Sequence, residues 1–104
     1  EIHTDLSAFR RGRGGPGGWV IYPEPELQLG RDVLVPDLAG WRLENLHDGP
    51  QVARFHSVPD WVCEILSPST ATFDRGKKAR RYREAGVAWL WIVDPNYGSV
   101  EVLR

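Results

Sequence analysis

The chain has 104 residues, of which 41% are hydrophobic and 26% charged, as in one globular domain with a single core. No apolar run approaches the roughly 20 residues that span a bilayer, and no secretory signal opens the sequence. One cysteine cannot form an internal disulfide, so we expect a reducing, cytoplasmic setting. The net charge of -1 argues against DNA binding by the whole surface and leaves only a local interface.

The N-terminal segment is amphipathic. Ile2, Leu6 and Phe9 recur at helical spacing within residues 1–11, which predicts a short helix. We expect this helix to extend before the first residue, so that it is truncated here. Residues 11–18 are rich in glycine and proline, which deny the chain regular structure, and they predict a flexible loop.

Strand-like segments follow, bounded by turn residues. They are residues 19–22, 26–29 and 33–43. A turn at 30–32 joins the second segment to the third, which indicates a meander of antiparallel strands. Residues 44–59 keep no sustained period and predict an irregular loop.

The second half predicts a strand, a helix and a strand in succession. Residues 60–66 form the first strand, and residues 74–85 form a basic helix that Gly86 closes. The almost continuous apolar run 87–93 is typical of a strand buried on both faces, and a last strand covers 99–103. The order α-β-β-β-α-β-β predicts an α/β fold, more narrowly an α+β mixed sheet with a right-handed crossover.

Two carboxylates occupy positions where apolar strands would place core side chains. Asp37 follows Pro36 within the run 33–43, and Glu64 lies inside the strand 60–66. An ionised carboxylate is expensive to bury unless it is paired, hydrogen-bonded or bound to a metal. The pair therefore predicts a shared divalent cation, and oxygen ligands favour magnesium, with manganese as a substitute.

The basic helix brings an ammonium group to these acids. Asp74, Lys78 and Tyr82 recur every four residues, which stacks them on one stripe about 6 Å apart per step. Phosphodiester hydrolysis by a metal-bound water requires a cation that polarises the phosphate and a positive charge that offsets the transition state. The remaining basic side chains form either a solvated face or a phosphate-binding surface; they are Lys77, Arg80, Arg81 and Arg83.

Each element also has a structural alternative. Asp37 would cap a turn after proline, Glu64 would pair with an arginine of the helix, and Asp74 would favour the helix dipole. Cys63 points to the opposite face from Glu64 and is read as a buried apolar residue, not a nucleophile. The three histidines are too scattered for a metal motif.

Several blocks of sequence carry a specific pattern in a fixed order. They are Val35-Pro36-Asp37-Leu38-Ala39-Gly40-Trp41-Arg42, Asp60-Trp61-Val62-Cys63-Glu64-Ile65-Leu66-Ser67-Pro68-Ser69-Thr70, Asp74-Arg75 with Lys78 and Tyr82, and Gly86-Val87 with Trp91-Ile92-Val93-Asp94-Pro95. With these blocks nearly the whole chain resembles the Uma-two family of restriction endonuclease-like proteins. The resemblance implies the PD-(D/E)XK nuclease fold, a central mixed sheet flanked by helices, as a single domain over residues 1–104.

The resemblance also implies roles for individual residues. Asp37 and Glu64 match the ligands of the catalytic metal, and the backbone carbonyl of Ile65 is the implied third ligand. An upstream acid that such folds place near the metal matches Glu26, with Glu24 as the competing residue.

The chain departs from the general nuclease pattern two residues after Glu64, where Leu66 replaces a lysine. In this family a helix lysine fills the same space, which nominates Lys78, with Lys77 as the alternative. Asp74 and Tyr82 are further candidates for the site.

The sequence therefore predicts a magnesium-dependent DNA endonuclease. Asp37 and Glu64 hold the metal, and Lys78 positions or activates the water. The residues expected to contact the DNA backbone are Arg75, Arg80 and Arg81.

Two other functions stay open. The replacement of lysine by Leu66 favours a nuclease-fold protein without activity that binds DNA or a protein partner. A structural homodimer through tryptophan-rich strands is the third reading, with Trp61 and Trp89 at its surface.

Overall fold

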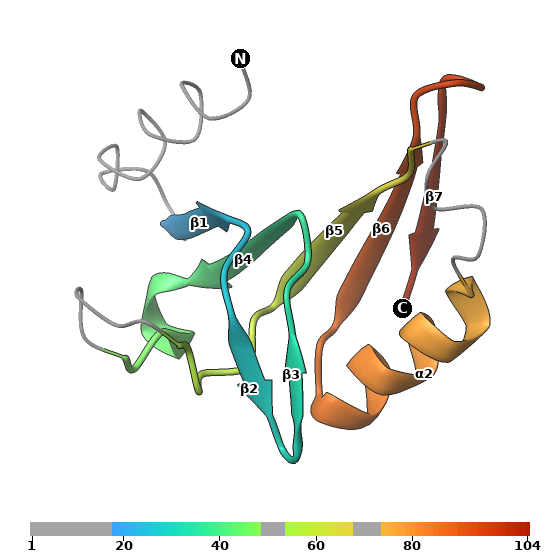
Figure 1. Ribbon diagram of the computed structural model, residues 1–104. Helices are drawn as coiled ribbons and strands as arrows, with labels where there is room; N and C mark the ends of the chain where they lie inside the picture. The colour runs from blue at the N-terminus through green and yellow to red at the C-terminus, as the bar shows by residue number, and fades with distance from the viewer. Residues whose placement is uncertain (1–17, 49–53, 68–73) are drawn as a thin grey trace.

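The computed structural model describes residues 18–48, 54–67 and 74–104 (Figure 1). The helix expected at 1–11 and nearly all of the loop expected at 11–18 lie outside these ranges. The elements in chain order are β1 (Trp19–Pro23), β2 (Leu27–Leu29), β3 (Asp32–Leu34), β4 (Leu38–Arg42), the 3-10 helix η1 (Leu43–Asn45), β5 (Trp61–Ile65), α2 (Arg75–Ala85), β6 (Trp89–Asp94) and β7 (Ser99–Leu103). None of the helices within these ranges is long and apolar enough to cross a membrane.

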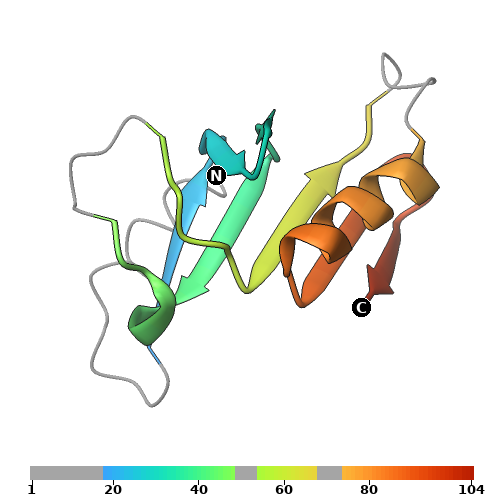
Figure 2. The same cartoon turned by 90° about the horizontal axis from the view of Figure 1, so that it is seen from below.

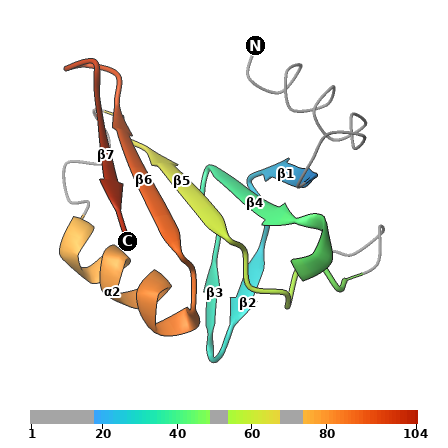
Figure 3. The same ribbon diagram turned by 180° about the vertical axis from the view of Figure 1, so that it is seen from behind.

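Five strands form one mixed sheet in the order β1-β4-β5-β6-β7, which Figure 3 shows from behind. β5 and β6 are parallel, and the other neighbours in this sheet are antiparallel. The strands β2 and β3 form a separate antiparallel hairpin. The helix α2 joins β5 to β6 and lies beside them, as the view from below in Figure 2 shows. The predicted α+β mixed sheet is confirmed.

The predicted strand at 33–43 is wrong as a single element, and so is the simple meander. β3 ends at Leu34 and β4 begins at Leu38, because Pro36 has no N–H to give to a ladder and is itself buried. β4 then pairs with β1 instead of with β3, and the β2–β3 hairpin is inserted between the two partners. Asp37 therefore lies just before β4, at the junction of hairpin and sheet.

The loop predicted at 44–59 contributes to the core. Phe55 is buried, forms a parallel bridge with Leu27 and stacks on Trp41 with ring centroids 4.8 Å apart. The Trp41 indole N–H donates to the Ser57 carbonyl at 2.9 Å. Aromatic packing thus fixes the second half of this loop against the hairpin and β4.

The helix α2 begins and ends where its sequence predicts. The Asp74 carboxylate accepts a hydrogen bond from the Lys77 amide at 3.0 Å, which caps the first turn. Gly86 adopts a left-handed φ of 99° at the other end. Tyr82 is the buried residue of α2, and its ring joins the core formed by the hairpin and one face of the sheet.

The two faces of β6 differ, which corrects the prediction of a strand buried on both sides. Leu90 and Ile92 are buried on the face that carries the core, whereas Trp91 on the other face is 39% exposed. Within the part of the chain that the structure describes, this second face is open.

Gly40 in β4 has almost no space for a side chain. A Cβ there would lie 3.0 Å from the Trp61 ring and 3.3 Å from Ile21 Cγ1. We expect Gly40→Val to lower the free energy of unfolding by about 1–3 kcal/mol, because overpacking forces the indole from its position. Urea denaturation followed by circular dichroism measures the change.

Gly76 on the exposed first turn of α2 provides the control, since the nearest atom to a Cβ there is 3.5 Å away. Gly76→Ala should cause no loss of stability. A Gly40→Val protein as stable as the Gly76→Ala protein would contradict the packing argument.

Candidate metal and catalytic site

Asp37 lies just before β4, and Glu64 lies in the neighbouring strand β5. The register pairs Leu38 with Cys63 and Ala39 with Val62, so Asp37 and Glu64 are each the next residue beyond the last pair. The charge of Asp37 helps to raise the pKa of Glu64, which indicates that the two carboxylates lie within electrostatic reach of each other. The two acids that the sequence singles out are thus brought together at one edge of the core.

The backbone holds Asp37 from two sides. Its Oδ2 accepts a hydrogen bond of 2.6 Å from the amide of Ile65, the residue after Glu64. Its carbonyl accepts a second bond of 2.8 Å from the amide of Glu24, which adopts a positive φ of 48°. The side chain of Asp37 is therefore anchored to β5, and its backbone is anchored to the segment between β1 and β2.

Glu64 is buried, with an exposed fraction of 8%, and two groups of α2 contact the same oxygen of its carboxylate. The Tyr82 hydroxyl donates to Oε2 at 2.8 Å, and Lys78 Nζ lies 3.5 Å from Oε2. Burial raises the pKa of Glu64, and the charge of Asp37 adds to this effect. Lys78 and Tyr82 act in the opposite direction, because each stabilises the ionised form.

Tyr82 stays a hydrogen-bond donor in this position. Burial is the main cause that raises the pKa of its hydroxyl, and the neighbouring Glu64 charge and hydrogen bond raise it further. A protonated Tyr82 therefore holds Oε2, and the second oxygen of Glu64 does not share these two partners.

The predicted stripe on α2 is only partly directed at the acids. Lys78 and Tyr82 reach Glu64, whereas Asp74 caps the helix and is exposed. Lys77 is exposed, and of the two lysines it is Lys78 that forms the ion pair with Glu64.

The two candidates for an upstream acid lie elsewhere. The carboxylate of Glu26 forms an exposed ion pair with Arg54 at 3.1 Å, and Glu24 contacts Asp37 through its backbone amide. Among residues 18–48, 54–67 and 74–104, no group of three or more histidine, cysteine or acidic side chains is placed to hold a metal. A cation at Asp37 and Glu64 would therefore take its other ligands from backbone, water or substrate, and the predicted role of the Ile65 carbonyl stays a prediction.

The basic residues of α2 differ in their availability for phosphate. Arg75 forms an ion pair with Glu101 of β7 at 3.2 Å, and Arg83 donates to the carbonyl of Arg104. Arg80 is exposed, and Arg81 is half-buried. The surface that remains open to a ligand is therefore centred on Lys77 and Arg80.

Sequence reasoning missed the contacts that position Asp37. The donors are the backbone amides of Ile65 and Glu24. Every residue except proline has such an amide, so the residue type does not show which amide will bond to Asp37. The spacing of four residues between Lys78 and Tyr82 did carry a signal, because it places both side chains on one side of the helix.

Comparisons with known proteins identify a family and a fold. The sequence model of the Uma2 family, described as "Putative restriction endonuclease", matches residues 1–104. The fold resembles the crystal structure of a "putative nuclease belonging to DUF820" from Anabaena variabilis, with a TM-score of 0.73 and 21% sequence identity. That match covers 98% of this chain and 59% of the other, so the chain spans 59% of the length of that nuclease. No curated protein matches the chain.

The structural likeness shows the fold, and the family match extends from the first residue to the last. The resemblance found in the sequence is thereby confirmed, and the chain belongs to the Uma2 family, whose description is "Putative restriction endonuclease".

Proposed function

We propose that this chain is the catalytic domain of a metal-dependent DNA endonuclease, with Asp37, Glu64 and Lys78 as its central residues. The proposal rests on the observation that these three residues, from different parts of the chain, come together at one place in the fold. The Asp37 carboxylate accepts a hydrogen bond from the amide of Ile65, the residue after Glu64, and Lys78 Nζ approaches Glu64 Oε2 to 3.5 Å. The family to which the chain belongs supports the same activity.

The donor set fits a hard divalent cation. Asp37 and Glu64 supply carboxylate oxygens, and the buried Glu64 has a raised pKa that the charge of Asp37 helps to cause. A shared cation would relieve this repulsion, and all-oxygen ligands favour magnesium or manganese over zinc. When bound, such an ion polarises the scissile phosphate and lowers the pKa of a coordinated water.

The protein's own groups then prepare the site. Tyr82 and Lys78 hold Oε2 of Glu64, which fixes the plane of the carboxylate and leaves its second oxygen for a ligand. The Lys78 ammonium, partly exposed beside the acids, stabilises negative charge that develops on the phosphoryl oxygens. Lys78 thus takes the place of the strand lysine that Leu66 replaces.

DNA binds through a local basic surface on α2. Lys77 and Arg80 are exposed and lie on the helix that carries Lys78. Because the net charge of the chain is -1, these few contacts, and not a general positive field, position the phosphate backbone.

A second candidate function is a DNA-binding module of the same fold without catalytic activity. Leu66, two residues after Glu64, is the observation that favours it, since this position supplies the lysine of the general nuclease pattern. Such a module would bind DNA without needing a divalent ion.

Substitution of either acid separates the two candidates. We expect Asp37→Asn and Glu64→Gln each to weaken Mn²⁺ binding by more than roughly 100-fold, because each removes a ligand charge from the site. Isothermal titration measures the affinity, and nicking of supercoiled plasmid with and without Mg²⁺ measures the activity, which should be lost with it.

Glu26→Gln is the matched control, since it removes a carboxylate that pairs with Arg54 away from the site. It should keep both metal binding and cleavage. Wild-type cleavage in the two site variants would exclude the proposed mechanism, and DNA binding without metal binding in the wild type would favour the inactive module.

The two neighbouring lysines should have different roles. Lys78→Met removes the ammonium beside Glu64 and is expected to lower cleavage on the order of 100-fold while Mn²⁺ still binds. Lys77→Met should affect DNA affinity and its salt dependence instead. Single-turnover cleavage and fluorescence anisotropy of labelled duplex measure the two effects. An equal loss of cleavage in both variants would contradict the assignment of Lys78.

Tyr82→Phe tests the support of Glu64. The ring volume is kept, but Glu64 loses a hydrogen bond that lowers its pKa, so its pKa rises further. A proton then competes with the metal at higher pH than in the wild type. We expect Mn²⁺ binding to weaken about 10-fold, with the difference growing as the pH falls.

Titrations at several pH values measure this pH dependence. If the Mn²⁺ affinities of Tyr82→Phe and the wild type differed by the same factor at every pH, or did not differ, the hydroxyl would not act through the ionisation of Glu64. Tyr97→Phe is the control, because Tyr97 is 84% exposed.

A further inference from the structure

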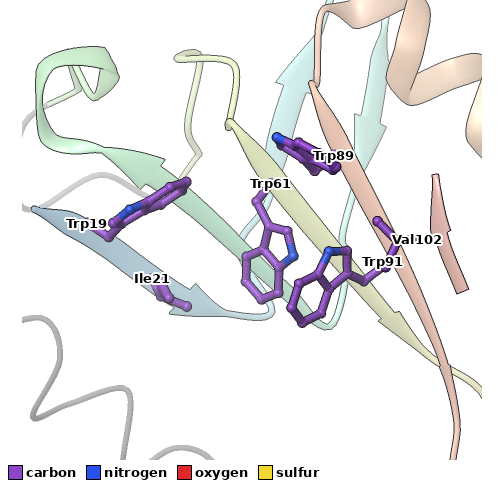
Figure 4. Close-up of a pocket in the computed structure, with 6 residues that line it drawn as sticks. All are labelled: Trp19, Ile21, Trp61, Trp89, Trp91 and Val102. Atoms are coloured by element: carbon purple, nitrogen blue, oxygen red, sulfur yellow. The ribbon is translucent and has the colours of Figure 1, made fainter. Parts of the chain in front are cut away.

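The turn between β6 and β7 presents the most exposed aromatic side chain among the residues that the structure describes. Tyr97 is 84% exposed, whereas Trp91, the next aromatic residue in this order, is 39% exposed. Trp91 packs edge to face on Trp61, with ring centroids 5.4 Å apart, as Figure 4 shows. The ring of Tyr97 lies in solvent instead and is open to a ligand.

Two features hold this turn in one conformation without using the tyrosine ring. Asp94 Oδ1 accepts a hydrogen bond from the Asn96 amide at 3.1 Å, and Gly98 adopts a left-handed φ of 63°. Behind the turn, five residue pairs join β6 to β7. A tyrosine has only two side-chain torsions to fix, so a contact made by its ring on this support costs little conformational entropy.

The turn lies at the end of the sheet that carries the two acids. β5 and β6 are parallel, and Glu64 pairs with Ile92 and Ile65 with Val93, so both strands end at the same edge. Open sheets bind ligands at the carboxyl ends of their parallel strands. A rise of about 3.3 Å per strand residue and one strand spacing of about 4.8 Å place Tyr97 on the order of 10–15 Å from Glu64.

This end of the sheet also offers positive charge beside an uncharged turn. α2 joins two parallel strands, so it begins at the carboxyl end of β5, with Lys77 exposed in its first turn. Arg75 binds Glu101 of β7 at 3.2 Å, which places the start of the helix beside the hairpin. Residues 95–100 carry no charged side chain. A phosphate backbone bound along the start of α2 would therefore meet an aromatic ring at the turn, and not an acid.

We propose that Tyr97 stacks on an unpaired base of the DNA, and that the substrate is DNA with a single-stranded segment beside a duplex. The inference rests on the proposed nuclease function and names its substrate class. The distance between Tyr97 and Glu64 corresponds to roughly three or four nucleotides, at about 3.4 Å for each stacked step. Stacking on an aromatic ring accepts any base, because every base has a π face.

The small number of phosphate contacts favours an unpaired base over a base inside a duplex. A ring reaches the face of a paired base only after that base has been unstacked, which costs free energy. Many phosphate contacts could supply this energy, but the net charge is -1 and the open basic surface is centred on Lys77 and Arg80. A base that is already unpaired avoids the cost, so the structure of the DNA selects the substrate.

Equilibrium binding by the full chain in a buffer without divalent ions tests this contact separately from cleavage. The two probes are a labelled duplex with a single-stranded overhang and a labelled blunt duplex of the same length, and fluorescence anisotropy measures both affinities. Tyr97→Ala should weaken binding to the overhang probe roughly 10-fold to 100-fold and leave binding to the blunt duplex unchanged. Tyr97→Phe keeps the ring and should bind both probes as the wild type does.

Val33→Ala is the control for the loss of an exposed apolar side chain. Val33 is 44% exposed on the β2–β3 hairpin, whose turn lies at the opposite end of the molecule from the β6–β7 turn (Figure 1). This variant should bind both probes as the wild type does. Wild-type affinity of Tyr97→Ala for the overhang probe, an equal loss on both probes, or no binding of the overhang by the wild type would overturn the inference.

Photo-crosslinking identifies the contact directly. A 5-iododeoxyuridine is placed at successive positions of the overhang, and mass spectrometry locates the crosslinked residue after irradiation. We expect a crosslink at Tyr97 that is absent in Tyr97→Ala. A crosslink that forms only at another residue would overturn the inference.

The nuclease function and this inference fail in different experiments. A wild type that cleaves DNA with Mg²⁺, but whose affinity for the overhang does not depend on Tyr97, would keep the function and overturn the inference. A wild type without cleavage whose affinity for the overhang depends on Tyr97 would exclude the nuclease function and still support the stacking contact.

Discussion

The hydrogen bond from the Ile65 amide to the Asp37 carboxylate is the contact on which the candidate site depends. β4 and β5 share only three paired positions, from Leu38↔Cys63 to Gly40↔Trp61. Asp37 lies one residue beyond β4 and after a proline, where a regular ladder does not continue. At this point the link to β5 is made by the side chain of Asp37, whose Oδ2 accepts a hydrogen bond from the Ile65 amide at 2.6 Å. The acid is thereby held beside Glu64 without being part of the strand.

The surroundings of Glu64 explain how the core accepts a carboxylate. Among the residues described, its partners are a tyrosine hydroxyl and a lysine, not the arginine of the structural alternative. Both partners come from α2, so the helix that crosses from β5 to β6 also compensates the buried charge. The raised pKa of Glu64 indicates that burial outweighs these two contacts. Burial thus disfavours the ionised form of Glu64, which is the premise of the metal site proposed above.

The sequence correctly predicted those features that depend on residues close together in the chain. The cap at Asp74, the left-handed Gly86 and the shared side of Lys78 and Tyr82 all follow from spacing within one helix. The pairing of β4 with β1 did not follow, because the β2–β3 hairpin separates them and no short-range pattern records a distant partner. The break at Pro36 was visible in the sequence, but the apolar run around it suggested one strand.

The same limit applies within the site. The acids were recognisable because carboxylates interrupt apolar strands, and the family pattern named Lys78 in place of Leu66. The amides that hold Asp37 belong to backbone whose position depends on the assembled sheet, so residue type could not reveal them. Glu26 illustrates the converse: it has the expected residue type, yet its carboxylate forms an exposed ion pair with Arg54 just before β2.

The alternation of β5 separates the chemistry of the site from the packing behind it. Val62 and Glu64 point toward the core and α2, while Trp61 points to the opposite face of the sheet, where its ring meets that of Trp91. Trp61 and Glu64 therefore belong to the same strand but lie on opposite faces of the sheet. The backbone of this strand is bonded to β4, β6 and Asp37. The backbone of β5 therefore carries the packing of Trp61 on one face and the contacts of Asp37 and Glu64 on the other.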